Sequence, residues 1–316
     1  MAAQMTRYEN IPGRVFADLP FDPEFGLDLR EQPKWDVPEK IIVKAALVGT
    51  PIKRTTNPHQ PYTTDEIRKE AIGCIEAGAT SIHFHPREDD GSVVLDPERY
   101  LDKLRRIIEP IKETYGDKVI IDGCTATLAF PGEAALIKSG LFEEAPVNCY
   151  SVAPRRLVEA EAQIMQENGV KPQIATYCDG DIDRAKRWLI DADLVEKPLY
   201  WIIVPAYITG CTPMPNPIAM AQSLIWQVSR IREIDSESVI MVCMSGRPSS
   251  YLSTQAMLLG LHVRVGMEDS IYRWPHKEDL IDSNATVVAG TIRICEALGR
   301  QVATADEHRG LVGLKK

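Results

Sequence analysis

Short apolar segments of strand length alternate with amphipathic segments of helical period from residue 41 onward. Apolar positions that recur every three or four residues predict helices, and short runs rich in Val and Ile predict buried strands. Strands are expected at 41–48, 80–85, 118–123, 146–151, 173–177, 199–205, 238–244 and 261–267. Helices are expected at 63–78, 97–114, 133–138, 154–168, 182–192, 217–234, 250–259 and 280–299.

This alternation of eight strands and eight helices is typical of an α/β protein with a closed (β/α)8 TIM barrel. No GxGxxG motif follows the first strand, which weighs against an open dinucleotide-binding sheet. Residues 1–40 are rich in Pro, Asp, Arg and aromatic residues without a clear period. They are predicted to form an N-terminal extension before a single catalytic domain at 41–316. This extension is interpreted as an arm that packs on its own barrel or on a neighbouring subunit, and a loosely ordered tail is the alternative.

Composition narrows the class of protein further. The chain has a net charge of −9 and no basic patch or arm, so we expect no nucleic-acid partner. Its seven cysteines are scattered and none form a CxxC pair, a pattern typical of reduced thiols in the cytoplasm. The first residues lack an apolar run, and no apolar stretch approaches the length of a membrane span, so neither a secretory signal nor a membrane association is expected.

The second predicted strand carries a candidate metal site. Side chains alternate between the two faces of a strand, so His83 and His85 point one way while Ile82 and Phe84 point the other way. The apolar pair is expected to face the helices, which leaves both histidines at the functional end of the barrel. Two imidazoles that converge there are typical ligands of a divalent cation.

The eighth predicted strand adds a carboxylate by the same alternation. Arg264 and Glu268 share the inward face, with Glu268 at the barrel mouth. Because the first and last strands close the barrel, Glu268 is expected to reach the ion held by the two histidines and to leave open positions for water or substrate. A purely structural Arg264–Glu268 ion pair is the alternative. Asp269 is the candidate general base, and Arg264 the group that stabilises an enolate or a carboxylate.

Two further arginines lie near the predicted mouth of the barrel. Arg247, after the seventh strand, offers a second cation for substrate or a surface charge, and Arg87 either binds a phosphate or forms a surface ion pair. A binuclear amidohydrolase is disfavoured because the fifth and sixth strands do not end in histidine. A single ion beside an arginine and an aspartate favours carbon–carbon bond chemistry next to a carbonyl group.

Two segments, 76–91 around the two histidines and 262–269 around Glu268, resemble the β-keto acid cleavage enzymes, a family that includes the 3-keto-5-aminohexanoate cleavage enzymes. Shorter similarities lie at 283–285 and 299–309, so the resemblance runs from about residue 41 to the end. It implies a zinc TIM barrel, usually a homotetramer. It also implies a reaction in which a β-keto acid and acetyl-CoA give acetoacetate and a new acyl-CoA.

By this resemblance, zinc chelates the keto acid through its keto and carboxylate oxygens. The implied ligands are His83, His85 and Glu268, and Arg264 and Asp269 carry the chemistry.

The chain departs from the family pattern around the substrate. Pro51 and Cys178 stand where the family often has acidic residues, Cys124 followed by Thr125 replaces a serine, and Cys149 loosely corresponds to a threonine. Cys124, Thr125, Cys149 and Arg247 are therefore the candidate substrate-binding residues, for a keto acid without an amino group. Two alternatives stay open, a metal-dependent aldolase or hydrolase that needs no CoA and a metal-binding barrel without catalysis. Manganese, iron or cobalt could replace zinc.

Overall fold

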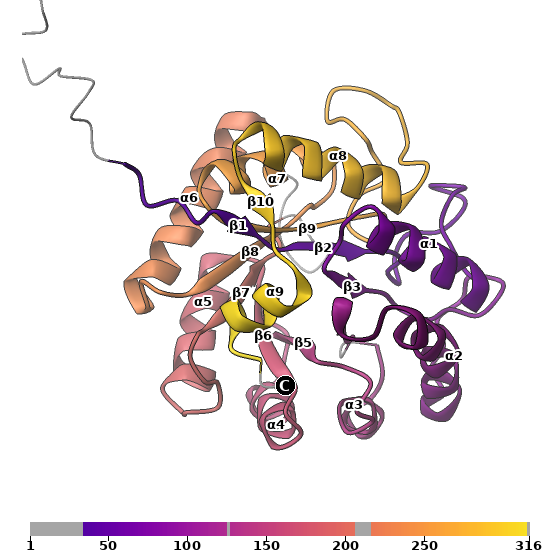
Figure 1. Ribbon diagram of the computed structural model, residues 1–316. Coiled ribbons are helices and arrows are strands. Elements are labelled where there is room, and N and C mark those ends of the chain that lie inside the picture. Colours follow the sequence, from indigo (N-terminus) through magenta and orange to yellow (C-terminus); the bar gives the residue numbers. More distant parts are fainter. Residues whose placement is uncertain (1–33, 125–126, 206–215, 315–316) are drawn as a thin grey trace, which may run out of the picture. The chain divides into compact units, whose positions relative to one another are not determined.

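The computed structural model describes residues 34–124, 127–205 and 216–314. Eight parallel strands form a closed barrel in chain order, and the last of them pairs with the first (Figure 1). The fold is therefore the predicted (β/α)8 TIM barrel. The barrel strands are β2 (Val43–Ala46), β3 (Ser81–His83), β4 (Ile120–Asp122), β5 (Glu144–Asn148), β6 (Lys171–Thr176), β7 (Tyr200–Ile203), β8 (Val239–Cys243) and β9 (His262–Val265).

Helices surround the barrel on the outside (Figure 1). They are α1 (Thr64–Glu76), α2 (Pro97–Tyr115), α3 (Phe130–Ile137), α4 (Arg155–Glu167), α5 (Asp179–Ala185), α6 (Pro217–Ile234), α7 (Ser249–Leu258) and α8 (Asn284–Ala297), with a short 3-10 turn η3 (Gly116–Lys118) and one π turn η4 (Lys186–Ile190). The predicted start of α1 is confirmed, because Thr63 and Glu66 form a reciprocal capping box. No described helix is long and apolar enough to cross a membrane.

Several predicted boundaries were wrong. The fourth strand begins at Glu144 instead of Pro146 and ends at Asn148, and the last outer helix begins only at Asn284. The chain also continues into two unpredicted elements, β10 (Gln301–Val302) and α9 (Ala305–Val312). The arm predicted at 1–40 lies outside the described residues up to residue 33. Its last residue, Lys40, belongs to β1 (Lys40–Ile41), which pairs with β10.

The core has two parts that follow the alternation along the strands. Ile82, Phe84 and the apolar residues of β9 pack against the helices, as predicted. A second apolar cluster fills the barrel interior, and it contains Tyr200 and Met241 together with Val312 of α9. The C-terminal helix therefore packs against the N-terminal ends of the strands, opposite the end where the chemistry is expected.

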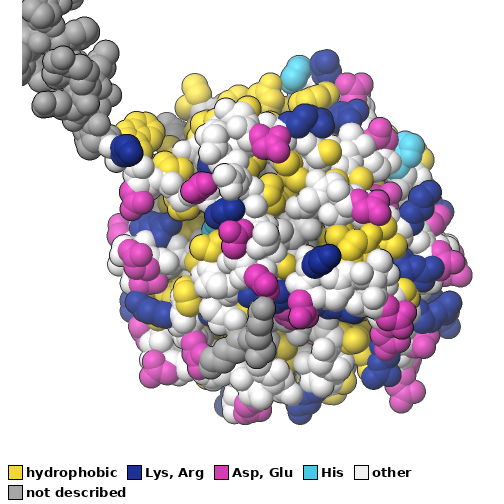
Figure 2. Space-filling model, viewed as in Figure 1, with side chains coloured by type: hydrophobic (Ala, Val, Ile, Leu, Met, Phe, Trp, Pro, Cys, Tyr) yellow, Lys and Arg dark blue, Asp and Glu magenta, His cyan; other side chains and the backbone are white. Residues whose placement is uncertain are grey.

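Arg300 ties the C-terminal part of the chain to that closed end. Its buried guanidinium donates hydrogen bonds to the carbonyl oxygens of Pro38, Lys40, Met257, Gly260 and Leu261 at 2.9–3.3 Å. One guanidinium thus joins the segment before β2 to the segment between α7 and β9. The face of the molecule seen in Figure 2 carries interspersed acidic and basic side chains without a large basic patch.

Two carboxyl groups between α3 and α4 are buried together, and they make stability depend on pH. Burial and the neighbouring Glu133 raise the pKa of Glu161 to about 9, and burial raises the pKa of Glu133 to about 7. Because both values exceed those of the unfolded chain, the stability they contribute is complete below about pH 4.5 and is lost as the pH rises through 7 to 9.

The Glu161→Gln variant is therefore expected to be more stable than wild type at pH 9, by on the order of 1–2 kcal/mol, and to differ little at pH 5. Melting temperatures of the two proteins between pH 5 and 9 measure this difference. A change at an exposed position of the same helix, Glu167→Gln, is the control. Parallel melting curves for wild type and Glu161→Gln across the range would contradict the assignment.

Candidate metal centre and active site

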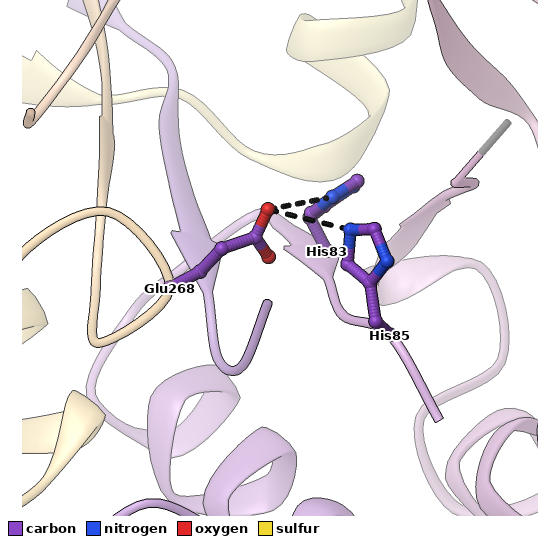
Figure 3. A group of neighbouring side chains, drawn as sticks. All are labelled: His83, His85 and Glu268. Atoms are coloured by element: carbon purple, nitrogen blue, oxygen red, sulfur yellow. Dashed lines mark ion pairs between the residues drawn. The ribbon is translucent and has the colours of Figure 1, made fainter. Parts of the chain in front are cut away.

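Three side chains converge at the open end of the barrel. His83 and His85 come from the end of β3, and Glu268 comes from the segment after β9 (Figure 3). One Glu268 oxygen, Oε1, lies 3.3 Å from His83 Nε2 and 3.5 Å from His85 Nε2. All three residues are buried, and one ligand atom from each lies within 4.8 Å of the others. The predicted cluster is therefore assembled in the folded chain.

Two glycines allow Glu268 to approach the histidines. A Cβ atom at Gly49 would lie 2.5 Å from Glu268 Cγ, so only glycine leaves space at the end of β2. Gly266 has a φ of +150°, and a Cβ there would lie 2.0 Å from the carbonyl oxygen of Ala46. A side chain at either position would collide with its neighbour. Glycine at 49 therefore leaves room for the Glu268 side chain, and glycine at 266 permits the turn that brings Glu268 inward.

Arg264 holds both acidic residues that follow it. Its Nη2 lies 2.6 Å from Glu268 Oε1, and its Nε and Nη2 each lie 2.8 Å from an Asp269 oxygen. The predicted Arg264–Glu268 ion pair is present, but it is part of the larger site instead of an alternative to it. The bidentate pair fixes the orientation of the Asp269 carboxylate.

The charges in the site shift the pKa values of its members. Burial lowers the pKa of His83, but Glu268 and Asp122 outweigh it and raise the pKa to about 9. Burial also lowers the pKa of His85, but Cys124 and Glu268 outweigh it and raise the pKa to about 10. Burial tends to raise the pKa of Glu268, but Arg264 and the histidines hold it well below its usual value.

Asp269 differs from Glu268 in its protonation behaviour. Burial raises its pKa above the usual value, against the opposing effect of Arg264. A carboxylate with a raised pKa accepts a proton more readily than an ordinary one. Asp269 thus combines a raised pKa with an orientation fixed by Arg264, the two features that a general base needs.

The donor set fits a divalent cation. Two imidazole nitrogens and a carboxylate are the ligands of zinc sites that keep a position open for substrate. Glu268 Oε2 is buried and has no hydrogen-bond partner within the described part of the chain. An oxygen in that state needs a cation or a donor, and this is the observation in favour of a bound metal.

The three residues line a cavity of about 180 Å³ at the barrel mouth. Cys124 also lines it, as predicted, and its Sγ lies 3.0 Å from His85 Nδ1. Thr127 Oγ1 lies 2.9 Å from the same nitrogen. These two groups contact the side of the His85 ring that faces away from Glu268, so they orient the ring.

Other predicted site residues lie elsewhere. Cys149 is fully buried and does not line the cavity, while Thr125 is outside the described residues. Arg247 lines a separate hollow and pairs with Glu278 at 2.9 Å. Arg87 is neither a surface residue nor free for phosphate, because it is 1% exposed and bonds to the carbonyl oxygen of Gly49.

Four uncharged polar residues of the cavity wall were missed. Thr50, Asn148, Tyr150 and Tyr177 line the cavity, and the Tyr177 hydroxyl donates to Asn148 Oδ1 at 2.7 Å. Strand alternation would have identified Asn148, because it shares the inward face of β5 with Glu144 and Pro146 whereas Cys149 does not. The predicted strand 146–151 already carried this signal, because Asn148 lies two residues after Pro146.

Comparison with known proteins assigns the family. Residues 40–314 match the β-keto acid cleavage enzyme family. The chain belongs to this family. The β-keto acid cleavage enzymes include a 3-keto-5-aminohexanoate cleavage enzyme of Fusobacterium nucleatum, which is 32% identical over 88% of this chain and 99% of its own length. The resemblance noted in the two metal-bearing segments is therefore confirmed.

More distant members and structures agree with this assignment. The 3-oxoadipate:acetyl-CoA acetyltransferase of Cupriavidus necator is 26% identical over 86% of this chain and 94% of its own length. A solved ternary complex of ObcA with a C4-CoA adduct and oxalate has a TM-score of 0.64 at 19% identity, covering 81% of this chain and 68% of that one. That likeness concerns the fold. As a β-keto acid cleavage enzyme, the protein is a transferase that cleaves a carbon–carbon bond.

Proposed function

We propose that this β-keto acid cleavage enzyme is zinc-dependent and converts a β-keto acid and acetyl-CoA into acetoacetate and a new acyl-CoA. The observation that carries the proposal is the buried cluster of His83, His85 and Glu268, with Asp269 fixed beside it by Arg264. Relatives whose names include acetyl-CoA as a substrate support the choice of co-substrate. A zinc ion in this cluster would polarise the keto and carboxylate oxygens of the substrate.

The surrounding residues have separate roles in this reaction. Asp269 removes a proton from the carbon between the keto and carboxylate groups, since its raised pKa suits a base. Arg264 stabilises the negative charge that develops on the enolate oxygen and keeps Asp269 in position. The cavity walls, including Ile202 and Val204, exclude water around the reacting carbon.

Turnover assays test this function. The zinc-loaded enzyme is mixed with a β-keto acid and acetyl-CoA, and both acetoacetate and the new acyl-CoA are quantified. Formation of the two products in equal amounts, only when acetyl-CoA is present, is expected. Cleavage of the keto acid without CoA would instead favour a metal-dependent aldolase or hydrolase. No turnover despite bound zinc would favour a metal-binding barrel without catalysis.

The keto acid is proposed to lack an amino group. Away from the metal cluster, the described wall of the cavity consists of uncharged residues such as Asn148, Tyr150 and Tyr177. No carboxylate of the described wall lies there to pair with an ammonium group. We expect 3-oxohexanoate to have a higher kcat/KM than 3-keto-5-aminohexanoate, which has the same carbon chain. The reverse order would refute this choice of substrate.

Arg247 is proposed to bind the nucleotide end of acetyl-CoA. It lines a hollow of about 220 Å³ with Pro248, Tyr251 and His276. The hollow lies beside the base, because Gly246 N donates to the Asp269 carbonyl oxygen at 2.8 Å. Aromatic and proline side chains offer stacking surfaces for adenine. The Arg247 guanidinium is exposed and pairs with the exposed Glu278, and a phosphate would replace Glu278 as its partner.

The Arg247→Gln variant is expected to raise the KM for acetyl-CoA about 3- to 5-fold, because one exposed charge pair is lost. The KM for the keto acid should not change. The increase should disappear when 3′-dephospho-acetyl-CoA replaces acetyl-CoA, because the phosphate partner is then absent. Lys277→Gln provides a control for loss of a neighbouring positive charge. An equal increase with both forms of the co-substrate would reject the phosphate contact.

The family resemblance also suggests a homotetramer, and the scattered unpaired cysteines suggest a cytoplasmic enzyme. Light scattering of the purified protein tests the first point. A monomer at micromolar concentration would exclude the tetramer.

A further inference from the structure

A line of charged side chains crosses the barrel interior below the metal cluster. Lys44 of β2 lies 2.6 Å from Asp122 of β4 and 3.0 Å from Glu144 of β5. All three side chains have no exposed surface. Burying such charges costs free energy that apolar residues would not, so a role beyond packing is indicated.

The upper end of this line reaches a candidate metal ligand. Asp122 Oδ2 lies 3.2 Å from His83 Nδ1, while the other ring nitrogen, Nε2, faces Glu268. Lys44 donates to the same Asp122 oxygen. A carboxylate beside the second nitrogen of a metal-bound histidine fixes the tautomer and the orientation of the ring. Asp122 has the position to do this for His83.

The lower end reaches the C-terminal helix. Glu144 Oε2 lies 3.3 Å from Nε2 of His308, a fully buried residue of α9. Ser81 donates to the other Glu144 oxygen at 2.8 Å, and the Tyr200 ring packs edge-on against the His308 ring at 6.2 Å. In Figure 1, α9 lies across the end of the barrel. A continuous set of polar contacts therefore joins α9 to the metal cluster.

We propose that this polar column, His83–Asp122–Lys44–Glu144–His308, positions the metal ligand His83, so that α9 supports the metal centre from the closed end of the barrel. The inference rests on the metal site of the proposed function. Each member is buried and lies 2.6–3.3 Å from the next. The contacts of Lys44 are short, whereas the contacts at the two ends, His83–Asp122 and Glu144–His308, are close approaches without a hydrogen bond. Removing one member takes away one charged or polar neighbour of the next member, which then shifts. Asp122 and His308 act through His83 and are positioning residues.

The test measures zinc affinity, by competition with a chelator, and the visible spectrum of the Co²⁺-substituted protein. Asp122→Asn keeps the shape of the side chain and is expected to weaken zinc binding about 10- to 100-fold. His308→Leu is expected to weaken it about 3- to 10-fold, a typical effect of a coupled residue without ligand contact. Both variants should change the Co²⁺ spectrum, because the ring of His83 is reoriented.

A second substitution in α9 separates positioning from general stability. Val312→Ala leaves a space beneath the same barrel interior and removes no member of the polar column. It should lower the melting temperature but leave zinc affinity and the Co²⁺ spectrum unchanged. Ser81→Ala removes one hydrogen bond to Glu144 and replaces Asp122→Asn as the test of the polar column if Asp122→Asn does not fold. It is expected to weaken zinc binding less than Asp122→Asn.

The outcomes distinguish this inference from the proposed function. If His308→Leu binds zinc as tightly as wild type and has the same Co²⁺ spectrum, α9 does not position the metal centre. That result would overturn the role of α9. The same result in Asp122→Asn would overturn the polar column as a whole. Absence of metal from the wild type, even after zinc is supplied, would overturn the metal site first.

Discussion

The His83→Ala variant is expected to lose its zinc, whereas wild-type protein binds one ion per chain. Two imidazoles and one carboxylate form the whole described ligand set, so removing one ligand should weaken binding by at least about 100-fold. Metal analysis after dialysis measures the difference. His59→Ala, which removes an exposed histidine outside the cluster, should retain the metal.

Zinc binding should also depend on pH in a defined direction. Without a metal, the pKa values of about 9 for His83 and about 10 for His85 mean that both rings are protonated at neutral pH. Zinc must displace these protons, so its affinity should fall as the pH is lowered, by up to about tenfold per unit for each proton released. Equal affinity at pH 6 and pH 8 would contradict the assignment of both rings as ligands.

The Asp269→Asn variant is expected to lose activity while keeping its metal. Asparagine has nearly the shape of aspartate but cannot accept the substrate proton, so kcat should fall about 10²- to 10⁴-fold. Arg264 and Glu268 remain paired in this variant, and zinc content should not change. Steady-state kinetics and metal analysis on the same samples test both statements.

A matched control for this variant is Asp282→Asn, an exposed aspartate on the loop before α8, which should have wild-type kinetics. Near-normal turnover by Asp269→Asn would mean that another group is the base. Loss of metal together with activity would mean that Asp269 supports the cluster instead of moving the proton.

The fold and the metal cluster could be predicted from local patterns because both depend on strand alternation. Each strand of the barrel has an apolar face toward the helices, and in β3 the opposite face carries His83 and His85. Barrel closure then brings Glu268 to them, since β9 pairs with β2. These relations follow from the order of the strands along the chain and need no knowledge of side-chain packing.

The cavity wall and the closed end of the barrel depend on tertiary contacts. Glu144 stands at the start of β5 in a fully buried position, although a charged residue ordinarily indicates a loop. Its burial depends on Lys44 and His308, which lie far away in sequence. β10 is only two residues long, too short to predict from a periodic pattern, and it forms because β1 and Arg300 lie beside it.

The pairing of the two chain ends has a consequence for synthesis on the ribosome. β1 pairs with β10, and β2 pairs with β9, across more than two hundred residues of sequence. A nascent chain that has not yet released β9 carries an unpaired edge on β2, the first barrel strand to emerge. Such an edge can pair with other chains. Chains that end before β9 therefore leave the barrel open and become targets for chaperones and proteases, while a chain that includes β9 and residue 300 closes the barrel and is tied to Pro38 and Lys40 through Arg300.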